Sequence, residues 1–341
     1  MLLPSTTEES CSGTSFMEEF EAKISLSEEI LLIFIAILAV LGNTVVLVLT
    51  WMERSLHQPS KYFIASLAVA DILVGIFVAP LNYYSLLLFK QPEPVDMPVH
   101  LCRFAVWIDT FALTTSIYTL TAISFDRYLK ISKPFQYKIQ MTTSKTFRLI
   151  FIIYFISAVI ATFGATPYSG SQGLLETSSG GCPEKEDDEG KVFETFLSIT
   201  AFILPATIIL VMYVFIFLVT HRRNKMLLNG EFGQTLNSQS KRTALRQDLK
   251  AIKTLFVVVG VFIICWAPWI VWIFLWYYSP DFINWESDSE SYWYRVDILS
   301  LVVRTLPLFN SLCNPIIYAC LDQKYTEAFK RLVKKITRRS K

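Results

Sequence analysis

The chain has 341 residues, of which 53% are hydrophobic and 18% are charged, and its mean hydropathy is +0.43. This balance excludes an ordinary water-soluble domain and indicates an integral membrane protein. The formal net charge is only +2. The distribution of charges along the chain is therefore more informative than their sum.

Seven apolar runs, each of about 20 or more residues, are long enough to cross a bilayer core as helices. The sequence predicts an all-α fold, a seven-transmembrane helix bundle, with an N-terminal arm at 1–28, the bundle at 29–320 and a C-terminal segment at 321–341. The runs cover residues 29–53, 62–88, 100–126, 147–168, 192–220, 249–278 and 294–320.

The segments between the runs alternate in charge. One set, together with the C-terminal stretch, is rich in Lys and Arg, whereas the other set is acidic, most of all in 184–189. By the positive-inside rule the basic segments are cytoplasmic. We therefore expect a multi-pass plasma-membrane protein in a lipid bilayer, with the acidic N-terminal arm outside the cell.

The C-terminal segment has a helical pattern of its own. Tyr325, Phe329, Leu332, Val333 and Ile336 recur at spacings of three and four among basic residues. Such a pattern is typical of a basic amphipathic helix that lies on the inner leaflet. A solvated basic tail is the alternative.

The third run carries ionisable groups near both ends. Asp109 and Arg127 are eighteen residues apart, which is five helical turns and about 27 Å on one helix face. Charged groups within a membrane usually face a cavity or a partner and mark functional sites. The sequence thus places an acid near one membrane face and a base near the other.

Short motifs follow one another in the successive runs: Gly42-Asn43, Leu67-Ala68-Val69-Ala70-Asp71, Cys102 with Asp126-Arg127-Tyr128, Pro205 and Tyr213, Phe262 with Cys265-Trp266-Ala267-Pro268, and Asn314-Pro315-Ile316-Ile317-Tyr318. In order and spacing, over about residues 29–337, the chain resembles the rhodopsin-like (class A) G-protein-coupled receptors, most of all the receptors for biogenic amines. The resemblance implies a receptor and not an enzyme. It would bind an extracellular ligand and activate a heterotrimeric G protein when the sixth helix moves outward.

The resemblance places the signalling switch in the inner half of the bundle. Prolines within helices remove a hydrogen bond and create kinks, and Phe262 lies beside one of them. In the resting state we expect Arg127 to contact Asp248, although two unrelated cytoplasmic charges are the alternative. The expected switch and G-protein-contact residues are Asp126, Arg127, Tyr128, Phe135, Tyr213, Asp248, Phe262, Pro268, Pro315 and Tyr318. Arrestin is a further candidate partner, and no nucleic-acid motif is present.

Two more sites follow from the resemblance. Asp71 with Ser116, Asn310 and Asn314 would hold a sodium ion, since hard cations prefer oxygen ligands; a protonated Asp71 bridged by water is the alternative. No other cofactor is expected. Cys102 and the extracellular Cys182 match the disulfide of the family.

The resemblance assigns the ligand site to the outer half. Asp109 matches the carboxylate that binds the ammonium group in amine receptors, and such a pair would form a charge-assisted hydrogen bond. The expected ligand-binding residues are Asp109, Thr110, Leu113, Thr114, Ser198, Ala201, Trp266, Trp269, Ile270, Ile273, Arg304 and Leu308.

The chain departs from the amine-receptor pattern at several of these positions. Thr305 and Leu308 replace the aromatic residues of the seventh helix, and Tyr154 replaces a tryptophan of the fourth. Arg304 is expected near Asp109, so it could pair with that acid, recognise the carboxylate of a zwitterion, or turn toward the acidic loops. A zwitterionic, amino-acid-like or peptide ligand is therefore the alternative to an amine, and a membrane transporter is a more distant one.

Overall fold

The computed structural model describes residues 8–91, 95–166, 188–228, 236–284, 287 and 289–339. All regular structure in these residues is helical. The helices are α1 (Glu8–Met52), η1 (Arg54–Leu56), α2 (Pro59–Leu73), η2 (Val74–Val78), α3 (Ala79–Phe89), α4 (Val99–Ser132), α5 (Pro134–Gln140), α6 (Thr143–Ala165), α7 (Asp188–Leu197), η4 (Ser198–Ile203), α8 (Leu204–Leu228), α9 (Leu236–Tyr278), η5 (Pro280–Phe282), α10 (Glu290–Leu321) and α11 (Gln323–Arg339).

Seven stretches within the described residues are long and apolar enough to cross a membrane. They match the seven predicted runs in order, so the predicted seven-helix bundle with an additional C-terminal helix is confirmed. The stretches are Ala22–Met52, Pro59–Leu88, Val99–Ser132, Thr143–Ala165, Lys191–Arg222, Phe256–Tyr278 and Ser291–Leu321.

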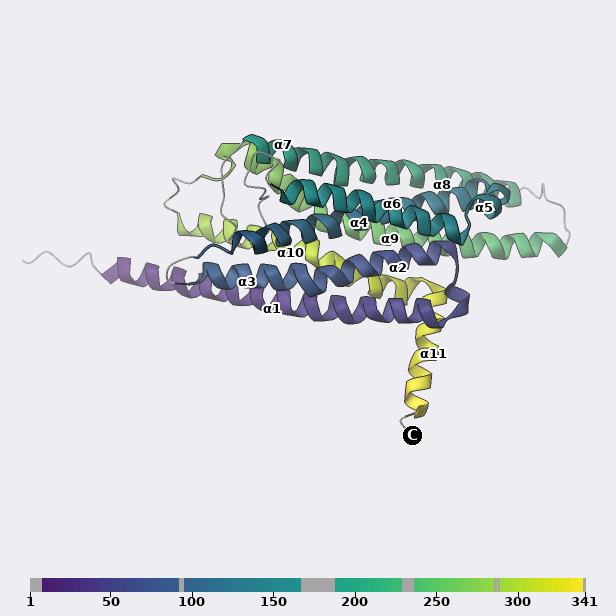
Figure 1. The fold of residues 1–341 in the computed structure, drawn as a ribbon, viewed down its shortest axis with the longest axis horizontal. Coiled ribbons are helices and arrows are strands. Elements are labelled where there is room, and N and C mark those ends of the chain that lie inside the picture. The colour runs from purple at the N-terminus through teal and green to yellow at the C-terminus, as the bar shows by residue number, and fades with distance from the viewer. Residues whose placement is uncertain are drawn as a thin grey trace, which may run out of the picture.

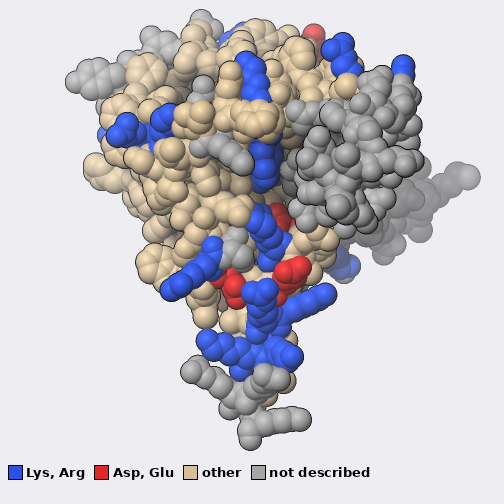
Figure 2. Space-filling view, turned by 90° about the vertical axis from the view of Figure 1, so that its right-hand side faces the viewer, with Lys and Arg blue, Asp and Glu red and all other residues tan. Residues whose placement is uncertain are grey.

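The long helices run side by side, and α11 leaves one end of the bundle at a steep angle (Figure 1). α4 occupies the centre, where it packs against α2, α6 and α8, and it is the most deeply buried of the seven spans. α10 packs against α1 on one side and α9 on the other. The end of the bundle that carries α11 displays a band of Lys and Arg side chains (Figure 2). This matches the expected cytoplasmic face.

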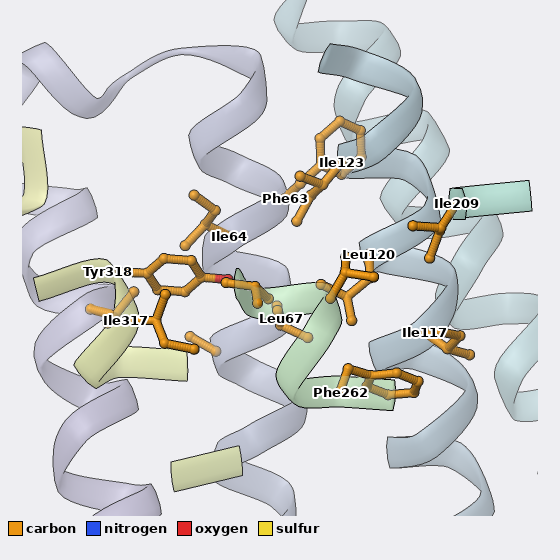
Figure 3. Close-up of a cluster of buried hydrophobic side chains, with 14 of the residues drawn as sticks. Phe63, Ile64, Leu67, Ile117, Leu120, Ile123, Ile209, Phe262, Ile317 and Tyr318 are labelled. Atoms are coloured by element: carbon orange, nitrogen blue, oxygen red, sulfur yellow. The ribbon is translucent and has the colours of Figure 1, made fainter. Parts of the chain in front are cut away.

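The main buried cluster brings together side chains from six spans, of which Figure 3 labels residues of α2, α4, α8, α9 and α10. Close packing of buried apolar side chains fixes how the helices face each other. This cluster therefore fixes the orientation of α4 relative to its neighbours. Its labelled members are Phe63, Ile64, Leu67, Ile117, Leu120, Ile123, Ile209, Phe262, Ile317 and Tyr318.

Small residues allow α1 to approach its neighbours closely. A Cβ atom at Gly75 would lie 2.8 Å from the Val40 side chain and 2.9 Å from the Ala36 carbonyl oxygen, and one at Gly42 would lie 3.0 Å from Pro315. Such contacts between helices are typical of membrane bundles. They bring the polar groups of α1 within reach of α10.

Two spans contain a short π-helical segment that ends two residues before a proline. η2 ends at Val78 and is followed by Pro80, and η4 ends at Ile203 and is followed by Pro205. A proline cannot donate its backbone hydrogen bond and its ring crowds the preceding turn, so a local widening relieves the strain. Pro268 and Pro315 lie inside α9 and α10.

The first helix is longer than the sequence predicts. α1 begins at Glu8, and its membrane-spanning part begins at Ala22. Residues 8–28, expected to be an arm, are thus helical. As a consequence, Glu28 lies on a rigid element with its side chain buried against the bundle.

Candidate functional site

Asp109 lies in the outer half of α4 and is half-buried. Among the described residues, no lysine or arginine forms an ion pair with its carboxylate. Its neighbours Ile108 and Ala112 belong to an apolar cluster that also contains Leu308 of α10. A carboxylate in these surroundings gains strongly from a cationic partner, because little water is present to solvate it.

Arg304 points to a different acid. Its Nη2 atom lies 3.4 Å from Oε2 of Glu28 on α1, and Asp297, two turns outward on α10, also attracts it. Lys90 at the end of α3 pairs with Glu29 in the same region. Of the alternatives that the sequence leaves open, the structure favours an Arg304 turned away from Asp109 toward acids at the outer end of the bundle.

The other residues predicted to line the pocket lie on α4, η4 and α9. Thr110 and Thr114 on α4 and Ser198 and Ala201 on η4 are buried. The Thr114 hydroxyl donates to the Thr110 carbonyl oxygen at 2.7 Å, so it is already satisfied within its own helix. Leu113 on α4 and, on α9, Trp266, Trp269 and Ile270 pack in or against the main buried cluster, while Ile273 lies farther outward on α9 and is half-buried.

Aromatic rings connect this wall to the hinge region. The Phe262 ring centroid lies 6.1 Å from that of Trp266 and 5.9 Å from that of Phe202 on η4. The Trp266 Nε1 is buried and has no hydrogen-bond partner among the described residues. A ligand group that accepts a hydrogen bond could therefore bind there.

Tyr154 on α6 takes the place of the family tryptophan with a hydrogen bond of its own. Its hydroxyl donates to the Ser66 carbonyl oxygen at 3.0 Å and lies 3.4 Å from the Ser66 hydroxyl. Its ring packs edge-on against Phe111. Tyr154 thus links α6 to α2.

A polar centre lies at mid-depth between α2, α4 and α10. The Asn314 side chain donates to Asp71 Oδ2 at 2.8 Å, and Ser311 also hydrogen-bonds to Asp71. Asp71 Oδ1 and Asn310 Oδ1 are buried without a hydrogen-bond partner among the described residues. Ser116 is buried on the facing side of the bundle, on α4.

At the inner end, the Tyr137 hydroxyl donates to Asp126 Oδ1 at 2.9 Å. Burial and the nearby Asp126 charge raise the pKa of Tyr137, which keeps this hydroxyl protonated. The Arg127 Nε lies 3.9 Å from Asp126 Oδ2. Phe135 on α5 is 87% exposed.

The contact expected between Arg127 and Asp248 involves a side chain outside the described part of the structure, and it stays a prediction. Tyr128 and Tyr213 pack against Phe215 and Phe256. Cys102 is disulfide-bonded. Its expected partner, Cys182, lies outside the described residues.

A further polar cluster lies at the inner end, and none of the sequence motifs predicts it. The buried Lys61 of α2 forms an ion pair with Asp322, which directly precedes α11, and lies 4.8 Å above the Tyr325 ring. The Tyr325 hydroxyl is 2.7 Å from that of Thr50 on α1, and its ring centroid is 5.9 Å from that of Tyr318. Burial raises the pKa of Tyr325, so the phenol stays protonated. We call Lys61, Asp322, Tyr325 and Thr50 the inner clasp.

The half-buried Asp109, the buried polar centre around Asp71 and the basic face at the α11 end thus belong to one seven-helix membrane bundle. The family model described as "7 transmembrane receptor (rhodopsin family)" matches residues 42–318. The chain belongs to this family, whose members are receptors coupled to G proteins and not enzymes.

The similar proteins include receptors for different ligands. The chain is 28% identical to the dog adenosine receptor A2a over 312 residues, covering 88% of this chain and 70% of that protein. It is 28% identical to the rabbit alpha-1A adrenergic receptor over 348 residues, an alignment that covers 92% of this chain and 70% of that receptor. It is 30% identical to the octopamine receptor beta-2R of Chilo suppressalis over 325 residues, an alignment that covers 88% of this chain and 77% of that receptor.

Proposed function

We propose that this protein is a cell-surface receptor for a small cationic amine, with its N-terminus outside the cell. The observation that carries the proposal is the half-buried Asp109 carboxylate, which has no cationic partner among the described residues. An ammonium group would supply that partner. Binding would stabilise the form in which α9 moves outward and a heterotrimeric G protein binds, and arrestin would be a second cytoplasmic partner.

The position of Arg304 argues against a zwitterionic ligand at Asp109. Its guanidinium is paired with Glu28 and is not presented to a ligand carboxylate. A neutral nucleoside, which the similarity to an adenosine receptor brings into consideration, would leave the Asp109 charge without compensation. Both classes nevertheless belong in the test.

The test is a second-messenger screen of cells that express the protein. The panel pairs amines with their parent amino acids, such as tyramine with tyrosine, tryptamine with tryptophan and histamine with histidine, and includes octopamine and adenosine. We expect a response to at least one amine and none to its amino acid. A response confined to amino acids or adenosine would contradict the proposal.

We further propose that Asp71, Ser116, Asn310 and Asn314 hold a sodium ion. The buried oxygens of Asp71 and Asn310 that have no hydrogen-bond partner fit a hard cation. The ion would neutralise Asp71 and stabilise the resting arrangement of α2, α4 and α10.

Sodium is therefore expected to stabilise the purified protein against thermal unfolding. At ten times its dissociation constant, a ligand contributes about 1.4 kcal/mol. The measurement compares the unfolding midpoint in sodium chloride and in choline chloride at equal ionic strength. Asp71→Asn should abolish the difference, and an equal sodium effect in that variant would rule out this site.

A further inference from the structure

We propose that Glu28 determines the ligand class of this receptor by holding Arg304 away from Asp109. With Glu28 in place, the pocket presents one negative charge and selects ligands that have a cation and no carboxylate. This inference rests on the proposed role of Asp109 as an amine anchor. It makes Glu28 a positioning residue that does not itself touch the ligand.

The pair that Glu28 forms with Arg304 is largely removed from water. The Glu28 side chain is 5% exposed and that of Arg304 is 30% exposed, with 3.4 Å between Oε2 and Nη2. Arg304 Nε is buried and has no hydrogen-bond partner among the described residues. Removal of the carboxylate would leave a guanidinium with too few acceptors, a state that costs far more than the loss of a surface ion pair.

Arg304 lies on the part of α10 that leads inward to the predicted pocket. Leu308, one helical turn or about 6 Å inward on α10, shares a buried cluster with Ile108 and Ala112, the neighbours of Asp109 on α4. An arginine side chain is long and flexible enough to cover such a distance. We expect a released Arg304 to turn inward toward Asp109, whose carboxylate has no cationic partner among the described residues.

The competing acid is Asp297, which lies two turns outward on α10 and, like Asp109, is half-buried. It already attracts Arg304 in the presence of Glu28. Asp297 lies near the outer start of its span, close to water, whereas Asp109 is flanked by Ile108 and Ala112 of the apolar cluster. A carboxylate near water gains less from a cation than one among apolar side chains. Asp109 is therefore the stronger acceptor once Glu28 is neutralised.

Two opposite effects follow from this movement. A guanidinium on Asp109 would compete with the ammonium group of an amine and weaken its binding. The same guanidinium would offer a carboxylate-binding fork to an amino acid. Neutralisation of Glu28 should therefore change ligand preference, whereas a general loss of packing would weaken both ligand classes.

The experiment compares Glu28→Gln with Glu29→Gln, which removes the same charge one residue along α1 but from a residue paired with Lys90. The ligands are the amine that activates the unmodified receptor best and its parent amino acid, in a second-messenger assay normalised to surface expression. For Glu28→Gln we expect the EC50 of the amine to rise by about tenfold or more, equivalent to about 1.4 kcal/mol. Glu28→Gln should also produce a response to the parent amino acid, which the unmodified receptor is expected to lack, and Glu29→Gln should produce neither change.

A double-mutant cycle tests whether the effect passes through Arg304. Arg304→Met removes the competing cation, so Glu28→Gln combined with Arg304→Met should have the amine potency of Arg304→Met alone. If Glu28→Gln does not reach the cell surface, Glu28→Asp takes its place. Its shorter side chain should weaken the contact with Arg304 and shift the amine EC50 in the same direction.

Several outcomes would overturn the inference. These are an unchanged amine EC50 in the Glu28 variants, equal effects of the Glu28 and Glu29 substitutions, or a Glu28 effect that persists in the Arg304→Met background. They leave the amine proposal intact as long as Asp109→Asn abolishes the amine response. An amine response that does not depend on Asp109 would instead refute the proposed function, and the role of Glu28 with it.

Discussion

Substitution of Asp109 by Asn is expected to raise the EC50 of an amine agonist by about 10- to 100-fold, the range that corresponds to loss of a charge-assisted hydrogen bond. The substitution keeps the size of the side chain and removes its charge. Ile108 and Ala112 beside Asp109 belong to an apolar cluster and carry no charge that could replace it. The loss should appear in ligand binding as well as in signalling.

The matched control is Asp96→Asn, the same chemical change at an exposed position outside the pocket. It tests whether Asp109 acts only through the general negative potential that attracts cations. We expect a change of no more than about threefold for this control, since exposed charges are screened by salt. Equal losses in the two variants would show that Asp109 is not the anchor.

Substitution of Asp322 by Asn is expected to lower the free energy of unfolding by about 3 kcal/mol, because Lys61 is then left buried without its counter-ion. The side chain of Lys61 is 4% exposed and that of Asp322 is 14% exposed. Asn also accepts hydrogen bonds at a helix N-terminus. It can therefore keep the contacts that Asp322 Oδ1 makes with the backbone N–H groups of Lys324 and Tyr325, and the measured loss reports mainly the ion pair.

The thermal unfolding midpoint of purified protein measures this effect. The control is Glu53→Gln, which breaks the contact of Glu53 with Arg331, a side chain that is 62% exposed. That pair also ties α11 to the bundle but lies in water, so we expect a loss below about 1 kcal/mol. Lys61→Met combined with Asp322→Asn should recover part of the stability. Equal losses for the two ion pairs would contradict a special role for the inner clasp.

The positions of the spans could be predicted from the sequence because each depends on local composition. An apolar run of the right length has few alternatives to a membrane helix. The two π-helical segments could not be located, since their prolines, Pro80 and Pro205, are compatible with a kink or with a widened turn. The helical state of 8–21 was missed because these residues lack the apolar character of the span.

The partner of Arg304 illustrates what sequence patterns leave open. The sequence makes Asp109 and the acidic loops candidates for the partner of Arg304, whereas it places Glu28 at the end of the predicted N-terminal arm. Pairing across 276 positions of the chain depends on how α1 packs against α10. The inner clasp was missed for the same reason: Lys61 and Asp322 each looked like a charge flanking an apolar run, and their pairing depends on where α11 begins.

The contacts between α1 and α10 have a consequence for how the protein is made. Glu28 with Arg304 near the outer end and Asn43 with the Ser311 carbonyl oxygen, at 3.0 Å, link the first span to the last. The first span leaves the ribosome long before the last one exists. During synthesis Glu28 and Asn43 of α1 are therefore in or beside the lipid before their partners on α10 exist, and ionisable or polar side chains in lipid have a high free energy. A chain that stops before α10 would leave Glu28 without Arg304, and Asn43 with only its bond to the Ala39 carbonyl oxygen within α1.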